Sequence, residues 1–406
     1  GPVMGMLTKL WSGRDELVLP KTADYHPPCL GTESVHPISI RYWPAYVKNP
    51  YQNLFYGRAN EQFRAEPGDP LTALSDVYSK PNATVCFHVH WLNFLFKEAE
   101  RNNDGYASFD QFLMNCRRIR DAGGVVAWTV HNLFEHESPD RSFEQRFRSE
   151  LAQIADIVIV HGDQLAQEVA QAFSVPVQKL LSIPHGSYVG VYSNDVDKTA
   201  ARSLLGAPKV ETLFANVGQM RSYKGLSNLG AAMDALQEDS SVGLLLAGQA
   251  GEAERVRVED MCKTLNNTLL QFQRIQNDEL QLYLNAADFV VLPYEQILTS
   301  GSAVLAFSFA RPIIAPALGG LRDLVQDNVN GFLYDPLAEG ALLGALKRAV
   351  ATSNDDRAAM SDAALATAAS LRWSLGRFKF ANAIAQSCPD ACRNSQSAGG
   401  RRVALV

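Results

Sequence analysis

The chain has 406 residues, of which 47% are hydrophobic and 20% are charged, and its net charge is −6. This composition is typical of a globular protein with large cores and excludes a fibrous or disordered one. The length favours two domains. The acidic balance gives no electrostatic reason to expect nucleic acid as a partner.

The cysteines and the hydropathy of the chain indicate the cellular compartment in which the protein is expected. The six cysteines are scattered and form neither a CxxC pair nor a zinc-binding spacing, so reduced thiols in a cytoplasmic protein are expected. No apolar run reaches the roughly 18 residues of a membrane span, and the N-terminus lacks the order of a signal peptide. Peripheral contact with the inner face of the plasma membrane is left open.

From about residue 37 onward, short apolar runs alternate with longer amphipathic ones, as in βα units built on a parallel sheet. The strands expected in the first half are PISIRYWP, ATVCFHVHWL, GGVVAWTVHN, ADIVIVHG and LLSIPHGSY. Helices are expected over residues 109–121 and 141–155. A polar stretch then interrupts the pattern, and the domain boundary is placed there, at residue 200.

The second series of strands reads TLFANVG, VGLLLAGQ, LLQFQRI, ADFVVLPY, PIIAPALGG and NGFLYDP. The prediction is an α/β protein with two Rossmann-like parallel-sheet domains that face a cleft, over residues 1–200 and 201–370. A helix over 371–388 is expected to pack back toward the N-terminal domain, and 389–406 form a polar tail. Ligands of such sheets bind at the carboxyl ends of the strands, so the cleft is where a ligand is expected.

A polar turn, Thr299-Ser300-Gly301-Ser302, lies between an apolar strand and a helix of small residues. Free backbone N–H groups and the helix dipole favour an anion such as a phosphate at a helix start. The alternative is an ordinary capping turn, because Ser and Thr are common helix caps. The turn alone therefore leaves both interpretations open.

A second turn in the same domain, NVGQMRSYKG, places Gly218 directly after a strand and Arg221 and Lys224 shortly before a helix. Two cations beside a glycine that permits close backbone approach suit a diphosphate. Solvated surface charges are the alternative. Because both turns follow strands of one domain, a nucleoside diphosphate becomes the favoured ligand.

The motifs VGQMRSYKG, LLLAGQ, NDEL, AADFVVLPY, TSGSAVLAFSFARPIIAPALGGLRDLV and NGFLYDP follow one another in the second half of the chain. Their order and spacing resemble the C-terminal half of GT-B glycosyltransferases of the group-1, glycogen-synthase-like kind. The first half matches that family only in its layout. The resemblance implies that the second domain binds a nucleotide-sugar donor and the first domain an acceptor.

Together with the two turns, the resemblance implies a set of donor contacts. The residues expected at the donor diphosphate are Arg221, Lys224, Thr299, Ser300, Gly301 and Ser302. Those expected at the donor nucleoside or sugar are Gly218, Gly248, Arg274, Tyr294 and Glu295. His185 and Tyr188, near the last strand of the first domain, are expected to contact the donor from the opposite side.

The chain departs from the family pattern at two places. Gln219 follows the glycine where the family has arginine, and Arg221 is the expected substitute. The two glutamates of the retaining signature are replaced by Ile297 and Leu305. The stereochemical course is therefore open, and an inverting enzyme would need a protein base for the acceptor hydroxyl.

The densest group of acid–base side chains is WTVHNLFEHESPD, directly after an expected strand. His131, Glu135 and Glu137 are the candidate catalytic residues. The carboxylates have an alternative role as exposed groups at the start of the helix from Arg141. No metal is expected, because the histidines lack ligand spacing and this fold stabilises the leaving group with a helix dipole and cations.

An acceptor site is expected from aromatic and polar residues near the strand ends of the first domain. Its candidates are Tyr51, His90, Trp91 and Asn93, since aromatic faces suit a pyranose ring. His88 is expected to be a structural core residue. The aromatic residues around Tyr51 have two further interpretations, a lipid-facing surface and plain core packing.

The sequence thus predicts a metal-independent hexosyl- or glucuronosyltransferase of bacterial polysaccharide or glycoconjugate synthesis. It would move a sugar from a nucleoside-diphosphate sugar to a saccharide or a lipid-linked saccharide. Two alternatives stay open: a nucleotide-sugar epimerase or hydrolase of the same fold, and a non-catalytic nucleotide-sugar binder. A dinucleotide dehydrogenase is disfavoured because no GxGxxG follows a strand.

Overall fold

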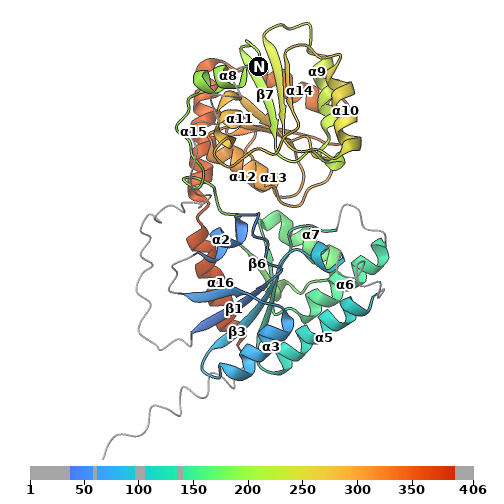
Figure 1. Cartoon of the computed structure of the whole chain (residues 1–406), viewed down its shortest axis with the longest axis vertical. Coiled ribbons are helices and arrows are strands. Elements are labelled where there is room, and N and C mark those ends of the chain that lie inside the picture. Colours follow the sequence, from blue (N-terminus) through green and yellow to red (C-terminus); the bar gives the residue numbers. More distant parts are fainter. Residues whose placement is uncertain (1–36, 58–61, 97–105, 135–139, 389–406) are drawn as a thin grey trace, which may run out of the picture. The chain divides into compact units, whose positions relative to one another are not determined.

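The computed structural model describes residues 37–57, 62–96, 106–134 and 140–388. They divide into two compact units, coloured along the chain in Figure 1. The N-terminal unit holds residues 37–185 and 372–388, and the C-terminal unit holds residues 186–371. The first boundary between the units, after His185, precedes the polar stretch in which the sequence predicted the domain boundary.

A six-stranded parallel sheet with the order β2-β1-β3-β4-β5-β6 forms the centre of the N-terminal unit. Its strands are β1 (Ile38–Trp43), β2 (Phe63–Pro67), β3 (Thr84–Val89), β4 (Val125–Thr129), β5 (Ile157–Val160) and β6 (Leu180–Ser182). Strands β3, β4 and β5 are buried throughout, as expected for a parallel sheet covered on both faces.

Helices cover both faces of this sheet (Figure 1). They are α2 (Tyr51–Tyr56), α3 (Pro70–Ser79), α5 (Ala107–Asp121), α6 (Arg141–Ile154), α7 (Asp163–Phe173), the 3-10 turn η1 (Val177–Lys179) and α16 (Trp373–Ser387). Asp69 and Asp140 cap α3 and α6 by accepting the backbone N–H of Thr72 and Phe143. These caps fix where the two helices begin.

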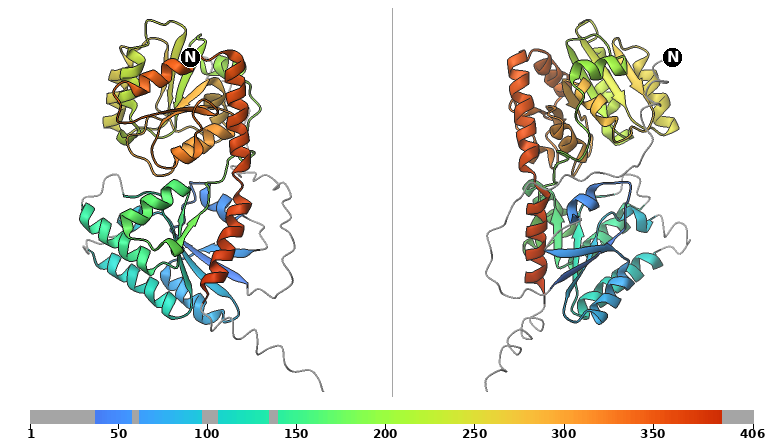
Figure 2. Two further views of the ribbon diagram at one scale, coloured as in Figure 1. Left: turned by 180° about the vertical axis from the view of Figure 1, so that it is seen from behind. Right: turned by 60° about the vertical axis from the view of Figure 1, so that its left-hand side comes forward.

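The last helix, α16, belongs to the N-terminal unit although it follows the whole C-terminal unit in sequence. Both views of Figure 2 show it lying along the N-terminal sheet. Phe380 and Ile384 are fully buried with Phe55 of α2 and Ile40 of β1. Arg377 also donates a hydrogen bond of 2.9 Å from its Nη1 to the carbonyl oxygen of Leu54.

The C-terminal unit repeats the architecture with the strand order β12-β11-β10-β7-β8-β9, again all parallel. Its strands are β7 (Thr212–Val217), β8 (Val242–Ala247), β9 (Thr268–Gln271), β10 (Phe289–Val291), β11 (Ile313–Pro316) and β12 (Gly331–Tyr334). Separate hydrophobic clusters pack on the two faces of this sheet.

The helices of the C-terminal unit pack on the two faces of its sheet. They are α8 (Lys198–Leu205), the 3-10 turn η2 (Ser222–Lys224), α9 (Leu226–Asp234), α10 (Glu252–Cys262), α11 (Leu280–Ala286), α12 (Gly301–Ser308), α13 (Leu321–Leu324), α14 (Ala341–Val350) and α15 (Asn354–Ser370). Helices α8, α11, α12 and α15 pack with one cluster, and α9, α10 and α14 with the other.

The predicted fold class, an α/β protein with two Rossmann-like parallel sheets, is confirmed, and every expected strand is present. Strand β2 was not expected from the sequence. Only Phe63 of its five residues is buried, so this edge strand lacks the apolar run by which the others were recognised. In the part of the chain that the structure describes, no helix combines the length and apolar character needed to cross a membrane.

Candidate functional site

The turn after β7 brings a cation next to a glycine. Gly218 has a φ of 127°, which side chains other than glycine rarely adopt, and a Cβ built on it would lie 3.8 Å from the Nζ of Lys224. The ammonium group of Lys224 therefore lies near the partly exposed backbone of Gly218 at the carboxyl end of the sheet. For a diphosphate the sequence predicted two cations beside this glycine, Arg221 and Lys224, and the structure places Lys224 there.

The neighbouring turn after β8 packs against this one through backbone atoms. A Cβ on Gly248 would lie 1.8 Å from the carbonyl oxygen of Gly218, so no larger residue fits there. The N–H of Gly248 donates to the carbonyl oxygen of Gln271 at the end of β9, over 2.9 Å. Gly248 is thus explained by backbone packing, and its expected contact with a nucleobase remains a prediction.

The segment after β10 joins the same group of turns. The N–H of Glu295 donates to the carbonyl oxygen of Tyr223 over 2.9 Å, and a Cβ on Gly225 would lie 1.9 Å from the carbonyl oxygen of Pro293. The Lys224 turn and the segment leading to α12 are therefore held in contact.

Ser300 begins α12 as its N-cap. Its Oγ accepts the N–H of Ala303 over 3.1 Å and lies 3.2 Å from the hydroxyl of Tyr294. The capping interpretation of the TSGS turn is therefore correct for the Ser300 hydroxyl. The N–H groups of Gly301 and Ser302 are the first two of the helix and have no acceptor within it, so they are the donors that an anion could use.

Two of the expected donor cations lie apart from these contacts. Arg221 and Arg274 are exposed, and in the described residues neither side chain makes a hydrogen bond or ion pair. Tyr294 is buried, with 4% of its surface exposed. Ile297 and Leu305, which replace the glutamates of the retaining signature, are partly buried and pack against the core of the unit.

The N-terminal unit has a different arrangement at the carboxyl edge of its sheet. A histidine follows each of the four adjacent strands β3, β4, β5 and β6; these residues are His90, His131, His161 and His185. The fifth described histidine, His88, lies within β3 itself. All histidines of the described residues are therefore gathered in one place.

Four hydrogen bonds join three of these histidines into a chain. His88 Nε2 lies 2.7 Å from Thr129 Oγ1, and His88 Nδ1 lies 2.7 Å from the hydroxyl of Tyr56. The same hydroxyl lies 2.6 Å from His90 Nε2. His90 Nδ1 then lies 3.1 Å from His131 Nε2. We call this series, Thr129–His88–Tyr56–His90–His131, the histidine chain.

His161 has a separate and simpler environment. Its Nδ1 lies 2.7 Å from the carbonyl oxygen of Ile183, and its Nε2 lies 2.8 Å from the hydroxyl of Tyr51. A carbonyl oxygen can only accept, so Nδ1 carries a proton, and in the neutral ring Tyr51 donates to Nε2. His161 is therefore held in place by protein hydrogen bonds at both ring nitrogens.

Aromatic rings enclose the histidines. Trp91 stacks on His131 with ring centroids 4.3 Å apart and an interplanar angle of 14°. Trp373, the first residue of α16, lies edge-on to His185 at 5.2 Å. Tyr51 makes ring contacts with His131 and His185. The surroundings of the imidazoles are therefore largely apolar.

Burial in this setting disfavours the charged form of each ring. Desolvation is the main cause that lowers the pKa of His88, His90 and His131 well below the usual value of 6.5, and it lowers the pKa of His161 to about 4. Neighbouring histidines lower the first three pKa values further. The imidazoles are thus neutral near pH 7, and a neutral imidazole can accept a proton.

Several residues that the sequence assigned to the site are buried. Tyr51 and His90 are 2% and 1% exposed and are hydrogen-bonded to protein, and their expected contact with an acceptor remains a prediction. Trp91 and Asn93 are partly exposed, and the Oδ1 of Asn93 is a buried acceptor without a hydrogen bond in the described part of the chain. Tyr188 is buried within the C-terminal unit, where its N–H donates to Ser308 Oγ.

The candidate bases Glu135 and Glu137 lie outside the described residues. Of the three proposed catalytic residues, only His131 is described. The sequence analysis did not single out His161 and Trp373, and it considered Tyr56 only among the aromatic residues around Tyr51. The signal for His161 was present in the sequence, because it follows the apolar run IVIV just as His131 follows VVAWTV.

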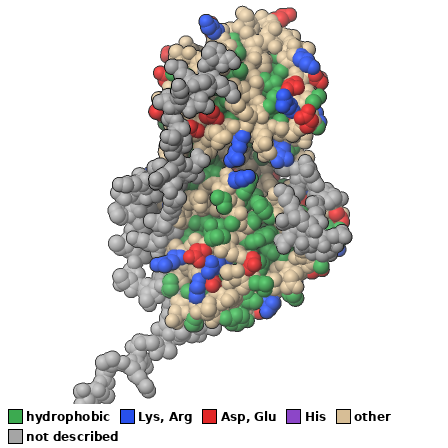
Figure 3. Space-filling view, in the orientation of Figure 1, with side chains coloured by type: hydrophobic (Ala, Val, Ile, Leu, Met, Phe, Trp, Pro, Cys, Tyr) green, Lys and Arg blue, Asp and Glu red, His purple; other side chains and the backbone are tan. Residues whose placement is uncertain are grey.

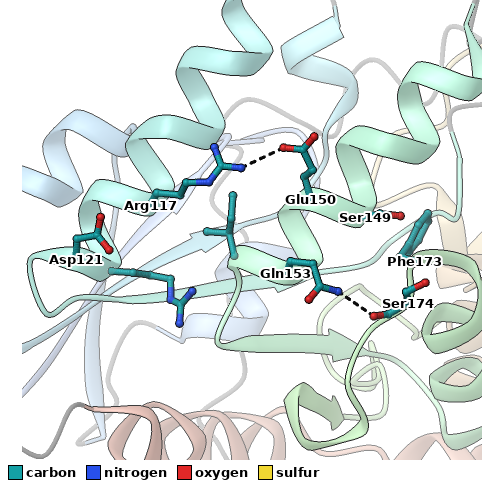
Figure 4. A pocket seen from close by; sticks show the side chains of 9 residues that line it. Arg117, Asp121, Ser149, Glu150, Gln153, Phe173 and Ser174 are labelled. Atoms are coloured by element: carbon teal, nitrogen blue, oxygen red, sulfur yellow. Dashed lines mark hydrogen bonds and ion pairs between the residues drawn. The ribbon is translucent and has the colours of Figure 1, made fainter.

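A hollow on the N-terminal unit lies away from these residues (Figure 4). It is lined by the carboxyl-terminal ends of α5, α6 and α7, which lead into the starts of the next strands. It therefore opens at the amino edge of the sheet, opposite to the edge where ligands of such folds bind. Arg117 in its wall is paired with Glu150 over 3.1 Å.

Comparisons with known proteins agree with this architecture. Residues 211–352, which lie within the C-terminal unit, match the family described as "Glycosyl transferases group 1". Solved structures that match are sucrose-phosphate synthase from Thermosynechococcus elongatus (TM-score 0.61, 18% identity, covering 84% of this chain and 80% of that one) and HepE of Anabaena in complex with UDP (TM-score 0.60, 15% identity, covering 86% and 100%). The fold is that of the GT-B glycosyltransferases.

Curated relatives share more sequence. A D-inositol 3-phosphate glycosyltransferase from Xylanimonas cellulosilytica is 27% identical over 204 residues, which are 47% of this chain and 48% of the relative. A GDP-mannose:glycolipid 4-beta-D-mannosyltransferase from Xanthomonas campestris pv. campestris is 25% identical over 265 residues, 64% of this chain and 69% of the relative. The chain thus spans about half the length of the first relative.

Proposed function

We propose that the chain is a glycosyltransferase that moves a hexosyl or glucuronosyl group from a nucleoside-diphosphate sugar to a hydroxyl of a saccharide or lipid-linked saccharide. The observation that carries this proposal is the Lys224 ammonium over the Gly218 backbone, in contact with the segment that leads to α12. The match of residues 211–352 to the group 1 family supports it, since the residues concerned lie within that range.

In this proposal the C-terminal unit holds the donor diphosphate. Lys224 neutralises part of its charge, and the N–H groups of Gly301 and Ser302 donate to its oxygens. Arg221, being exposed and without a protein partner in the described residues, can turn toward the same anion. These groups stabilise the nucleoside diphosphate as it leaves with the electron pair of the broken C–O bond.

His131 of the N-terminal unit takes the proton of the acceptor hydroxyl in this scheme. As the acceptor oxygen forms its bond to the anomeric carbon, the O–H bond breaks and the proton moves to the imidazole. The lowered pKa keeps the ring neutral and ready to accept it. Apolar residues occupy the positions of the two glutamates of the retaining signature. The proposal is therefore an inverting course, in which a protein base takes the proton of the acceptor hydroxyl.

The acceptor is proposed to be lipid-linked, as in the glycolipid mannosyltransferase named above. The loop after β1 exposes Tyr46 and Val47, and Tyr46 packs edge-on to Trp91 at 5.5 Å. Figure 3 shows apolar side chains in several groups on one face of the N-terminal unit. We propose that the enzyme works without a metal at the inner face of the plasma membrane, in polysaccharide or glycoconjugate synthesis.

Lys224→Ala tests the donor assignment, with Lys209→Ala as a matched control on an exposed lysine just before β7. Thermal shifts are recorded with UDP, GDP and ADP, since a ligand that binds the folded state raises its apparent stability. We expect one nucleotide to stabilise the wild-type chain and the control, and Lys224→Ala to lose most of that shift. An equal shift in all three proteins would contradict the assignment.

A turnover assay completes the test. Incubation of the donor with EDTA and a panel of saccharide and lipid-linked acceptors should give a glycosylated product. Free sugar or an epimer formed from donor alone would favour a hydrolase or epimerase instead. Tight nucleotide binding with no turnover on any acceptor would favour a non-catalytic binder.

A further inference from the structure

Two histidines at the carboxyl edge of the N-terminal sheet are partly exposed, and an indole meets each of them in a different way. These are His131 and His185; the other histidines of the described residues are buried. Trp91 lies along His131, with ring centroids 4.3 Å apart and planes inclined by 14°. Trp373 meets His185 edge-on, with centroids 5.2 Å apart and planes inclined by 60°.

The stacked arrangement of Trp91 and His131 bears on the charge of the imidazole. The face of an aromatic ring is the negative part of its quadrupole, and the edge is the positive part. A cation over the face of tryptophan within about 6 Å of the ring centroid is therefore attracted to it, and tryptophan attracts cations more strongly than phenylalanine does. A protonated His131 would place its charge over the indole face of Trp91.

Neighbouring rings hold the indole of Trp91 in this position. Tyr46 meets it edge-on with centroids 5.5 Å apart, and Tyr51 does so at 5.7 Å. The face of Trp91 is thus oriented toward His131 before any proton arrives. A group that is fixed in advance stabilises a developing charge without reorganising at the moment of reaction.

The other groups around His131 disfavour its charged form or leave it unchanged. Burial is the main cause that lowers the pKa of His131, and positive charge on neighbouring histidines lowers it further. The Arg148 side chain, which donates to the carbonyl oxygen of Asn132, is paired with Glu144 at 2.8 Å, so this pair adds no net charge. The titratable and charged groups around His131 are His90 after β3, His161 after β5, His185 after β6, Tyr51 of α2, and Glu144 and Arg148 of α6.

We propose that Trp91 is a positioning residue that stabilises the protonated form of His131 through its indole face and so makes His131, rather than His185, the proton acceptor. The catalytic consequence rests on the proposed function, in which His131 is the base. Because the ring is neutral before the reaction, this stabilisation grows only as the proton arrives. An interaction that strengthens toward the transition state raises kcat.

Two substitutions of Trp91 separate this role from simple shielding of the imidazole. Trp91→Phe keeps an aromatic face, and Trp91→Leu replaces it with an apolar side chain of similar size to phenylalanine. A smaller apolar cover admits water, which favours the charged imidazole. Loss of the aromatic face has the opposite effect, because it removes the attraction for the cation. Shielding alone therefore predicts that His131 binds a proton at least as readily in Trp91→Leu as in Trp91→Phe.

The test measures protonation of His131 directly, without an assay of activity. The ring ¹⁵N signals of protein labelled with ¹⁵N-histidine change strongly on protonation, and His131→Gln identifies the signals of His131. Spectra are recorded between pH 7 and pH 5, where circular dichroism shows each variant to be folded. At the same pH, we expect the protonated fraction of His131 to be about threefold lower in Trp91→Leu than in Trp91→Phe.

Trp373→Leu is the matched control, because it removes an indole that meets His185 edge-on. It should lower the protonated fraction of His131 less than Trp91→Leu does. If Trp91→Leu does not fold, Trp91→Met supplies a second non-aromatic cover for the comparison with Trp91→Phe. An equal or higher protonated fraction in the non-aromatic variant, or an equal loss in Trp373→Leu, would overturn the proposal.

Turnover then separates this proposal from the proposed function. If the enzyme is a transferase with His131 as its base, kcat should be up to about threefold lower in Trp91→Leu than in Trp91→Phe, with the donor KM unchanged. A lower protonated fraction with equal kcat would support the stabilising contact but remove His131 as the base. Equal protonated fractions with a lowered kcat would overturn the role of Trp91 and leave the base in place.

Discussion

The two units build the same six-stranded parallel sheet but use its carboxyl edge in different ways. In the C-terminal unit the edge consists of backbone brought together by glycines, with the Lys224 ammonium above it. In the N-terminal unit the edge consists of imidazole and aromatic rings. Under the proposed function, the same fold presents an anion site at the edge of one sheet and a proton acceptor at the edge of the other.

The largest expected difference between the units is their response to acid. A histidine whose pKa is lowered by folding is neutral in the folded chain, while the unfolded chain binds a proton below pH 6.5. Stability is therefore lost as the pH falls from 6.5 toward the folded pKa. For His161, with a folded pKa of about 4, the loss amounts to about 3 kcal/mol, and His88, His90 and His131 add to it.

Tryptophan fluorescence of a Trp11→Phe variant can follow this loss in one unit, because the other four tryptophans of the sequence, Trp43, Trp91, Trp128 and Trp373, lie in the N-terminal unit. No histidine follows His185 in the sequence. Urea unfolding is measured at pH 7 and at pH 5. The midpoint followed by fluorescence should be lower at pH 5, and the midpoint of the part of the circular-dichroism signal that comes from the C-terminal unit should change less. Parallel losses in both signals would contradict the comparison.

The second largest effect is expected on catalysis at the carboxyl edge of the sheet in the N-terminal unit. His131→Asn should lower kcat by about 100-fold or more, because general-base catalysis contributes about 100- to 10,000-fold. Nucleotide binding should stay as in the wild type, since the donor residues lie in the other unit. The measurement is steady-state turnover together with thermal shift. A lowered nucleotide affinity with an unchanged kcat would assign His131 to the donor instead.

The two edges also differ in how far the sequence could predict them. The apolar strand runs predicted the sheets, and Gly218 with Lys224 could be placed together because a few residues of one turn separate them. The histidine chain joins Tyr56, His88 and Thr129 across three segments. Neither the periodicity of a strand nor a short motif contains those pairings, so the role of Tyr56 required the structure.

Burial is the property of the expected acceptor residues that the sequence did not indicate. Tyr51 and His90 have the residue types of a sugar site, and their sequence context gives no indication that the two rings are buried against each other. The structure shows each hydroxyl or ring nitrogen satisfied by another side chain. The same limit of sequence-based prediction applies to the glycines. The sequence indicates that Gly248 lies in a turn, but not that it packs against the carbonyl oxygen of Gly218.

The smallest expected effect separates capping from anion binding at Ser300. Aspartate is as good an N-cap as serine and interacts favourably with the helix dipole, so Ser300→Asp should preserve the stability of the C-terminal unit. Ser300→Ala removes the acceptor for the Ala303 N–H and should lower stability by about 1 kcal/mol.

The two substitutions should affect nucleotide affinity in the opposite order, with the larger effect in Ser300→Asp. The added carboxylate repels a diphosphate at the N–H groups of Gly301 and Ser302, so Ser300→Asp should weaken nucleotide binding about tenfold, or about 1.4 kcal/mol. Ser300→Ala should bind nearly as the wild type. Calorimetric titration of the folded variants measures both. If Ser300→Asp binds the nucleotide as well as Ser300→Ala does, the start of α12 is a cap and no more, and Lys224 must hold the donor with other groups.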